Sequence, residues 1–150
     1  MKPLIVLIAV FFIALMIIKI TGNNFEFAPA ARIAMSAMLL FTAVAHFAFT
    51  KGMMMMVPVF IPLKKQVVYL TGIIEIAAAA GLQVPAVRVL TGWLLILFFA
   101  LMLPANINAA IRHIDYQKGT ADGSGVNYLW FRVPLQIFFI AWVFLSAIKF

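Results

Sequence analysis

The hydrophobic positions of this sequence form long runs that are separated by short polar segments. Five runs are apolar over helical lengths, namely residues 3–18, 33–50, 66–87, 89–111 and 129–148. At a rise of about 1.5 Å per residue, segments of this length approach or span a hydrocarbon core of about 30 Å. They are continuously apolar and do not alternate as the strands of a membrane barrel do. The pattern therefore predicts an all-α, polytopic membrane helical bundle with five transmembrane helices.

The first run, residues 3–18, lies between Lys2 and Lys19. A cleaved signal peptide is the rival interpretation, because a basic start and an apolar segment are followed by the Ala-Pro-Ala of residues 28–30. That tripeptide lies well past the end of the run, and the run is long for a signal peptide. We therefore expect an uncleaved first helix.

The composition supports a membrane location. Hydrophobic residues make up 67% of the 150 residues and charged residues 10%, with a mean hydropathy of +1.16, which exceeds what a soluble core of this size encloses. The net charge of +7 comes from Lys and Arg at the ends of apolar runs, so we expect contact with lipid headgroups and no nucleic-acid binding. Seven of the eleven basic residues lie on the side of the N-terminus, which favours a cytoplasmic N-terminus.

The sequence shows no residues that would form a redox centre. It has no cysteine, which excludes disulfides, thiolate nucleophiles and iron–sulfur ligation by this chain. Its two histidines and four acidic residues show no metal-ligand spacing, so we expect no metal site. Any electron chemistry would need a borrowed cofactor or a partner.

Polar residues converge in one half of the predicted bundle. The second and fourth runs end, and the third and fifth begin, on the side of the two long loops. The candidate ligand-binding residues on that side are His46, Tyr69, Glu75, Asn106, Arg132 and Gln136. Intramembrane ionisable groups are functional candidates by default.

Glu75 is the acidic residue inside a long apolar run. Because Gly72, Glu75 and Ala79 share one helix face, Glu75 should project into the bundle. An unpaired carboxylate at that depth is costly, so Glu75 should be protonated, hydrogen-bonded or paired with His46 or Arg132. Glu75 and His46 are thus candidates for proton handling, and the alternative is a pair that only locks two helices together.

A Met-rich segment lies between the second and third runs. Four methionines are followed by two prolines, which makes the segment too short for a span and too interrupted for a long helix. We predict an interfacial or re-entrant lid over a hydrophobic ligand or a partner, formed by Met53, Met54, Met55, Met56, Pro58 and Pro62. Ordinary packing against lipid is the alternative.

Several short segments together carry a family resemblance. They are His46-Phe47, Met56-Val57-Pro58, Ile61-Pro62, Tyr69-Leu70-Thr71-Gly72 with Glu75, Gly81-Leu82, Pro85, Arg88, Pro104-Ala105-Asn106 and Arg132-Val133-Pro134-Leu135-Gln136. In this order the segments resemble the DoxX-like family of small integral membrane proteins. The resemblance implies a four-helix bundle over residues 32–148, with residues 1–20 as an additional N-terminal helix of a single membrane domain, residues 1–150.

The resemblance also implies a function. Members of the DoxX-like family are linked to quinol oxidase and to thiosulfate:quinone oxidoreduction, and animal relatives are similar to receptor-assembly chaperones. We therefore expect an accessory or quinone-interacting subunit of a membrane oxidoreductase, in the bacterial cytoplasmic (inner) membrane with the N-terminus inside. Its ligand would be a quinone or a lipid. Its partners would be the bilayer, oxidoreductase subunits or another client protein, and a homo-oligomer is compatible with this. The alternative is a non-catalytic lipid-binding or membrane chaperone protein.

Overall fold

Six α-helices form most of the chain in the computed structural model, which describes residues 2–22 and 24–150. The helices are α1 (Lys2–Gly22), α2 (Phe27–Ala48), α3 (Thr50–Met56), α4 (Lys64–Gly81), α5 (Arg88–Ile111) and α6 (Leu129–Val143). A 3-10 turn, η1 (Val126–Tyr128), precedes α6, and a π-helical end, η2 (Phe144–Lys149), follows it. The predicted all-α class is confirmed for the described residues.

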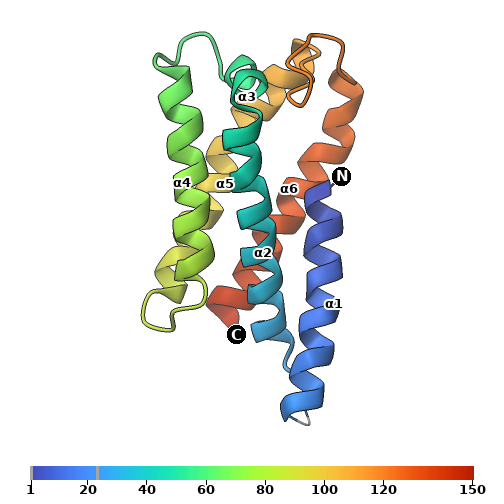
Figure 1. The fold of residues 1–150 in the computed structure, drawn as a ribbon, viewed down its shortest axis with the longest axis vertical. Coiled ribbons are helices and arrows are strands. Elements are labelled where there is room, and N and C mark those ends of the chain that lie inside the picture. Colours follow the sequence, from blue (N-terminus) through green and yellow to red (C-terminus); the bar gives the residue numbers. More distant parts are fainter. Residues whose placement is uncertain (1, 23) are drawn as a thin grey trace.

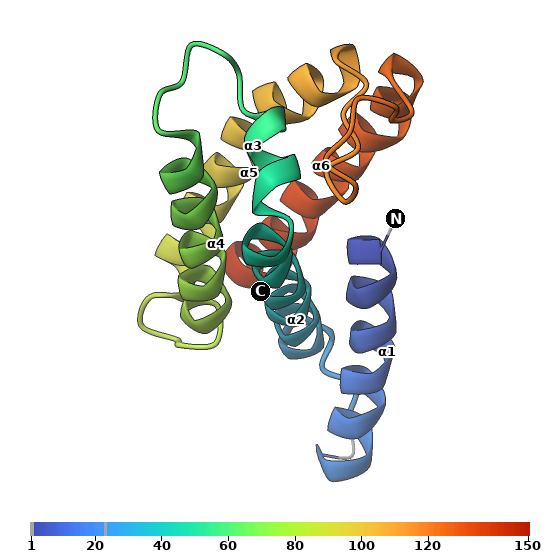
Figure 2. The ribbon, with the colours of Figure 1, turned by 45° about the horizontal axis from the view of Figure 1, so that its top comes forward.

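The helix α2 is the centre of the arrangement. It packs against α1 on one side and against α4 on the other, and it also contacts α3, α6 and η2. The helix α5 packs against α6 and η2. Figures 1 and 2 show α1 at the edge of the bundle, with α3 and the long loop before α6 at the opposite end from the C-terminus.

Four of the five predicted spans are helices long and apolar enough to cross a membrane. They are Lys2–Gly22, Phe27–Ala48, Arg88–Ile111 and the continuous stretch Val126–Lys149. The helix α4 has 18 residues but carries Lys64, Lys65 and Glu75. Its apolar character is therefore lower than that of the other long helices.

The helix ends differ from the predicted runs for identifiable reasons. The helix α2 begins at Phe27, earlier than residue 33, and the chain bends at Phe49 before α3 begins. The helix α4 ends at Gly81, well before residue 87, because Gln83 and Val84 donate their amides to carbonyls three residues back. Tight turns of this kind replace the α-helical ladder.

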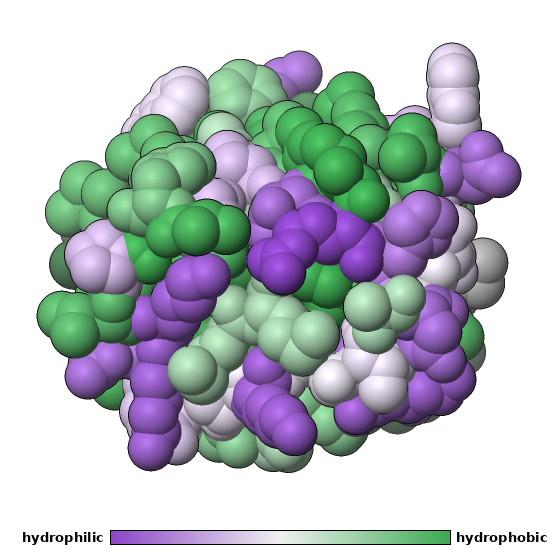
Figure 3. All heavy atoms as spheres, turned by 90° about the horizontal axis from the view of Figure 1, so that it is seen from above, coloured by the Kyte–Doolittle hydropathy of each residue, from purple (hydrophilic) through white to green (hydrophobic). Residues whose placement is uncertain are grey.

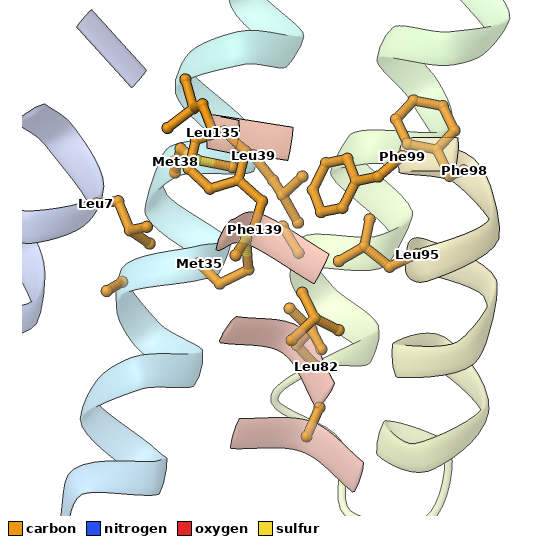
Figure 4. Close-up of a cluster of buried hydrophobic side chains, with 14 residues drawn as sticks. Leu7, Met35, Met38, Leu39, Leu82, Leu95, Phe98, Phe99, Leu135 and Phe139 are labelled. Atoms are coloured by element: carbon orange, nitrogen blue, oxygen red, sulfur yellow. The ribbon is translucent and has the colours of Figure 1, made fainter. Parts of the chain in front are cut away.

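One cluster of buried apolar side chains takes residues from all of the long helices. The outward-facing side chains of these helices are not part of it. Figure 4 shows its centre, to which α1 contributes Leu7, α2 contributes Met38 and α5 contributes Phe99. The outer surface stays apolar as well, since Val44 is 66% and Leu101 62% exposed. A contiguous apolar exterior on this scale is expected of a protein surrounded by lipid.

The end of the molecule that carries α3 is the polar one. Figure 3 looks onto this end, where hydrophilic side chains lie among apolar ones. The loop before α6 is folded on itself there, because Asp115 accepts the amides of Gln117 and Lys118 and forms an ion pair with Lys118 at 3.7 Å. The Thr120 hydroxyl donates to the Asp122 carboxylate and lowers the pKa of Asp122.

This loop packs directly on α3 at Gly52, which is buried. A Cβ on residue 52 would overlap the Tyr116 carbonyl, and backbone cannot move aside as a flexible side chain can. The absence of a side chain at Gly52 therefore allows the loop to cover α3.

Replacing Gly52 with alanine should displace the loop and destabilise the protein by about 2 kcal/mol, the usual scale of overpacking. Thermal unfolding in detergent measures the effect. Gly22→Ala is the matched control, because nothing lies within 4 Å of a Cβ at that position. Equal melting temperatures for the two variants would contradict the described packing.

Candidate functional site

The α2–α4 interface holds the most deeply buried acidic residue of the described chain. The buried residues of α4 are Val68, Thr71, Gly72, Glu75 and Ala79, which lie on one helix face. The predicted face of Gly72, Glu75 and Ala79 is thus confirmed. A Cβ at Gly72 would lie 3.0 Å from the His46 Cβ, so the glycine lets the two helices approach closely.

Glu75 pairs with His46 across this interface. The Glu75 Oε2 atom lies 3.2 Å from His46 Nδ1, and the two side chains are 8% and 13% exposed. Of the two predicted partners, the structure therefore places His46 against the carboxyl group. Arg132, which is half-buried near the start of α6, takes part in no ion pair among residues 2–22 and 24–150.

The hydrogen bonding of His46 leaves the carboxyl group incompletely satisfied. His46 Nδ1 lies 3.0 Å from the Thr42 carbonyl oxygen. A carbonyl oxygen can only accept, so we infer that Nδ1 carries a hydrogen and directs it toward Thr42. Glu75 Oε2 has no partner with hydrogen-bond geometry, although it lies near the same nitrogen. That oxygen can accept one further donor or carry a proton itself.

Aromatic and hydroxyl side chains lie beside the end of α2 that carries His46. Phe47 stacks on Tyr69 with ring centroids 5.6 Å apart, and Tyr69 thus contacts the residue after His46. The Thr50 hydroxyl donates to the His46 carbonyl at 2.8 Å and secures the end of α2 beside the bend at Phe49. Phe47 itself is 45% exposed.

The remaining predicted polar residues, Asn106 and Gln136, lie on α5 and α6. Gln136 donates its side-chain amide to the Phe99 carbonyl. Asn106 is 8% exposed, and its Nδ2 atom is buried without a hydrogen-bond partner among the described residues. No hydrogen bond or ion pair links either residue to Glu75 within the described part of the chain.

The predicted lid is the short helix α3 and the turn that follows it. The four methionines are half-buried, Pro58 is buried and Pro62 is exposed. Asn108 on α5 donates to the Met56 carbonyl at 2.7 Å, and the Lys64 Nζ atom donates to the Val57 carbonyl at 3.1 Å. The segment is therefore fastened to both α4 and α5.

A second polar contact, which the sequence analysis did not single out, joins the middle of α2 to the C-terminal end of α4. The Ser36 hydroxyl donates to the Ala79 carbonyl at 2.7 Å, and Gln83 donates to the Ser36 oxygen at 2.7 Å. Ser36 lies ten residues before His46, which turns it by about 80° around the helix axis, so helical spacing did not associate the two residues. The available signal was a polar side chain within an apolar run.

Two cavities lie away from Glu75. One, of about 350 Å³, lies at the polar end beside Lys2, Asp115 and Tyr128. The other, of about 530 Å³, is an apolar groove beside Phe11 and Trp142. Neither is lined by His46 or Glu75, whose side chains are largely buried.

The helices and the buried ion pair define the class of this molecule, which is an all-α helical bundle with four candidate membrane-spanning helices in its described residues and an ionisable pair between α2 and α4. A family model described as "Domain of unknown function (DUF8561)" matches residues 35–147. The chain therefore belongs to this family. No curated protein and no solved structure matches the chain.

Removing His46 tests how much the pair contributes. His46→Ala leaves a buried carboxyl group without its cationic or hydrogen-bonding neighbour, and we expect a loss of about 3 kcal/mol in the free energy of unfolding. The double variant His46→Ala with Glu75→Gln should recover much of that loss, because no buried charge remains. Denaturation in mixed micelles measures both, and additive losses would contradict direct coupling.

Proposed function

We propose that this protein is a DoxX-like accessory subunit of a quinone-linked membrane oxidoreductase, and that Glu75 and His46 bind the quinone headgroup or exchange protons with it. The observation that carries the proposal is the Glu75 Oε2 atom, which is buried in the bundle and lacks a complete hydrogen bond. Ionisable groups inside a membrane protein cluster along ligand and proton pathways. The motifs around His46 and Glu75 resemble those of the DoxX-like family, and this resemblance also supports a quinone-linked function.

The chemistry of the pair suits a quinone and its quinol. A quinol hydroxyl can donate to the free carboxylate oxygen of Glu75, and a protonated Glu75 can donate to a quinone carbonyl. The chain would position the headgroup and move protons, while the electrons would pass through a cofactor of another subunit. Entry requires α3 to swing away from α4 about the bend at Phe49, which lies between α2 and α3.

The proposal includes α4 as the fifth span, with the N-terminus on the cytoplasmic side of a bacterial inner membrane. Lys64 and Lys65 lie in the first turn of α4, where long side chains reach the interface. The 16 residues after them give about 24 Å of helix, and their single charge, Glu75, faces α2. The excess of Lys and Arg on the side of Lys51 and Lys64 supports the orientation.

Quinone binding by the purified chain tests this function. A short-tailed quinone and its quinol should raise the melting temperature of the wild-type protein in detergent. Glu75→Gln should weaken binding at least tenfold, because the amide cannot exchange a proton with the ligand. Glu26→Gln is the control, since Glu26 is exposed and precedes α2.

Two outcomes would count against a quinone site at Glu75. The first is a wild-type protein whose melting temperature does not respond to either form of the ligand. The second is Glu75→Gln binding as tightly as the wild type, which would place the ligand elsewhere.

A specific feature favours a second candidate function, a non-catalytic chaperone or partner-assembly protein. The turn after α3 exposes Val59 by 77% and Phe60 by 82%, next to the half-buried residues Met53 to Met56. Methionine surfaces adapt to different apolar partners, and exposed apolar tips mark contact sites. The segment could then hold a client protein through the same residues that form the lid.

Serine at all four positions from Met53 to Met56 separates the two candidates. If the segment holds a client, photo-crosslinks from residue 60 to a defined partner protein should disappear, while the helical circular dichroism stays unchanged. Trp130→Ser is the control, because Trp130 is 84% exposed and lies outside this segment. Crosslinks that persist in the serine variant would exclude a docking role for the methionines.

A further inference from the structure

Two arginines, Arg32 near the start of α2 and Arg88 at the start of α5, lie at the end of the bundle opposite to α3. Arg32 on α2 donates from Nη1 to the Ser146 carbonyl at 2.8 Å. On α5, Gly92 lies against Ala147, since a Cβ on Gly92 would be 3.2 Å from the Ala147 Cβ. Arg88 is one turn before Gly92, at the start of α5. It is near enough to Arg32 for its charge to act on that guanidinium.

The chain does not neutralise this pair of cations. Neither arginine forms an ion pair among residues 2–22 and 24–150, and Glu26 is the acid whose charge acts on Arg32. The Arg88 Nε atom is buried and has no hydrogen-bond partner among the described residues. Like charges held together with a buried unpaired donor are unfavourable unless an anion joins them.

An apolar groove lies beside Arg32, which shares Ser146 with it. It has a volume of about 530 Å³ and lies between α1, the start of α2 and η2, where its walls include Phe11, Phe27, Ala31, Trp142, Ser146 and Phe150. Ser146 belongs to both features, because its carbonyl accepts from Arg32. The Trp142 Nε1 atom donates to the Ala31 carbonyl at 3.0 Å, which satisfies the polar atoms of the wall and leaves an apolar surface.

We propose that Arg32 and Arg88 bind the phosphate of an anionic phospholipid, and that one acyl chain of this lipid occupies the groove. Guanidinium groups bind phosphate oxygens through paired hydrogen bonds, and the Nε donor of Arg88 has no partner among the described residues. The groove volume falls within the range of roughly 300–1,000 Å³ that ligand sites occupy. An apolar groove next to two cations matches a phospholipid and not a free phosphate, which would leave the groove empty. The site is independent of Glu75, because neither cavity includes that residue.

Lipid exchange into the purified full chain tests the site. Phosphatidylglycerol and phosphatidylcholine with identical acyl chains are added to the protein in detergent, and bound lipid is counted by native mass spectrometry. We expect the wild type to retain phosphatidylglycerol at least tenfold more strongly than phosphatidylcholine. Arg88→Gln should remove that preference, and Arg32→Lys should reduce it while keeping the charge. Lys19→Gln is the control at the same end of the molecule and should keep the preference.

The groove is tested separately from the headgroup. In a variant with Trp93→Phe and Trp130→Phe, Trp142 is the remaining tryptophan of the three in the chain. Phosphatidylglycerol with brominated acyl chains should quench its fluorescence, and Ala28→Leu, which fills the groove wall, should reduce the quenching.

Three results would overturn the proposal. An equal retention of both lipids by the wild type would exclude recognition of the anionic headgroup, and an unchanged preference in Arg88→Gln would exclude the arginine pair. Inorganic phosphate that displaces the lipid at equal concentration would show that the groove contributes nothing.

Discussion

The close packing of α2 on α4 around one buried carboxyl group is the constraint on which the rest of the arrangement depends. Glu75 can be buried only if a neighbouring helix brings a polar partner to it, and Gly72 allows α2 to come near enough for His46 to do so. The same contact fixes the depth of α4 relative to α2. Because α2 also supports α1 and η2, the position of this pair sets the position of most other helices.

The two ends of the molecule differ in structure and in charge. At the polar end, α3 and the loop before α6 cover the bundle, and the cover is held by backbone contacts at Gly52 and by Asn108. At the opposite end, cationic side chains stand beside an apolar groove and have few acidic neighbours. At the first end, the covering segments hold one another in place. The second exposes charge where headgroups of a bilayer would lie.

The sequence was sufficient for features that depend on local periodicity. Long apolar runs predicted the helices, and a spacing of three and four residues placed Glu75 on the buried face of α4. Features that depend on distant contacts were not predictable in this way. The bend at Phe49, the π-helical end and the contact between Asn108 and Met56 arise from packing between segments far apart in sequence. Arg132 was an equally reasonable partner for Glu75 on depth alone, and the packing decided for His46, because α4 contacts α2 and has no contact with α6 in the described chain.

The family model matches only part of the chain, and the proposed quinone site and the proposed lipid site differ in how much of each lies within that part. The matched segment, residues 35–147, contains His46 and Glu75 together with all of α4 and the part of α2 from residue 35 onward. The lipid groove depends in addition on Phe11 and Phe27, and its cation pair depends on Arg32, all of which precede that segment. The ionisable pair is therefore built wholly within the part of the chain that defines the family. The lipid site arises where α1 is added to that part, so the two sites can differ in function while sharing α2 as a common support.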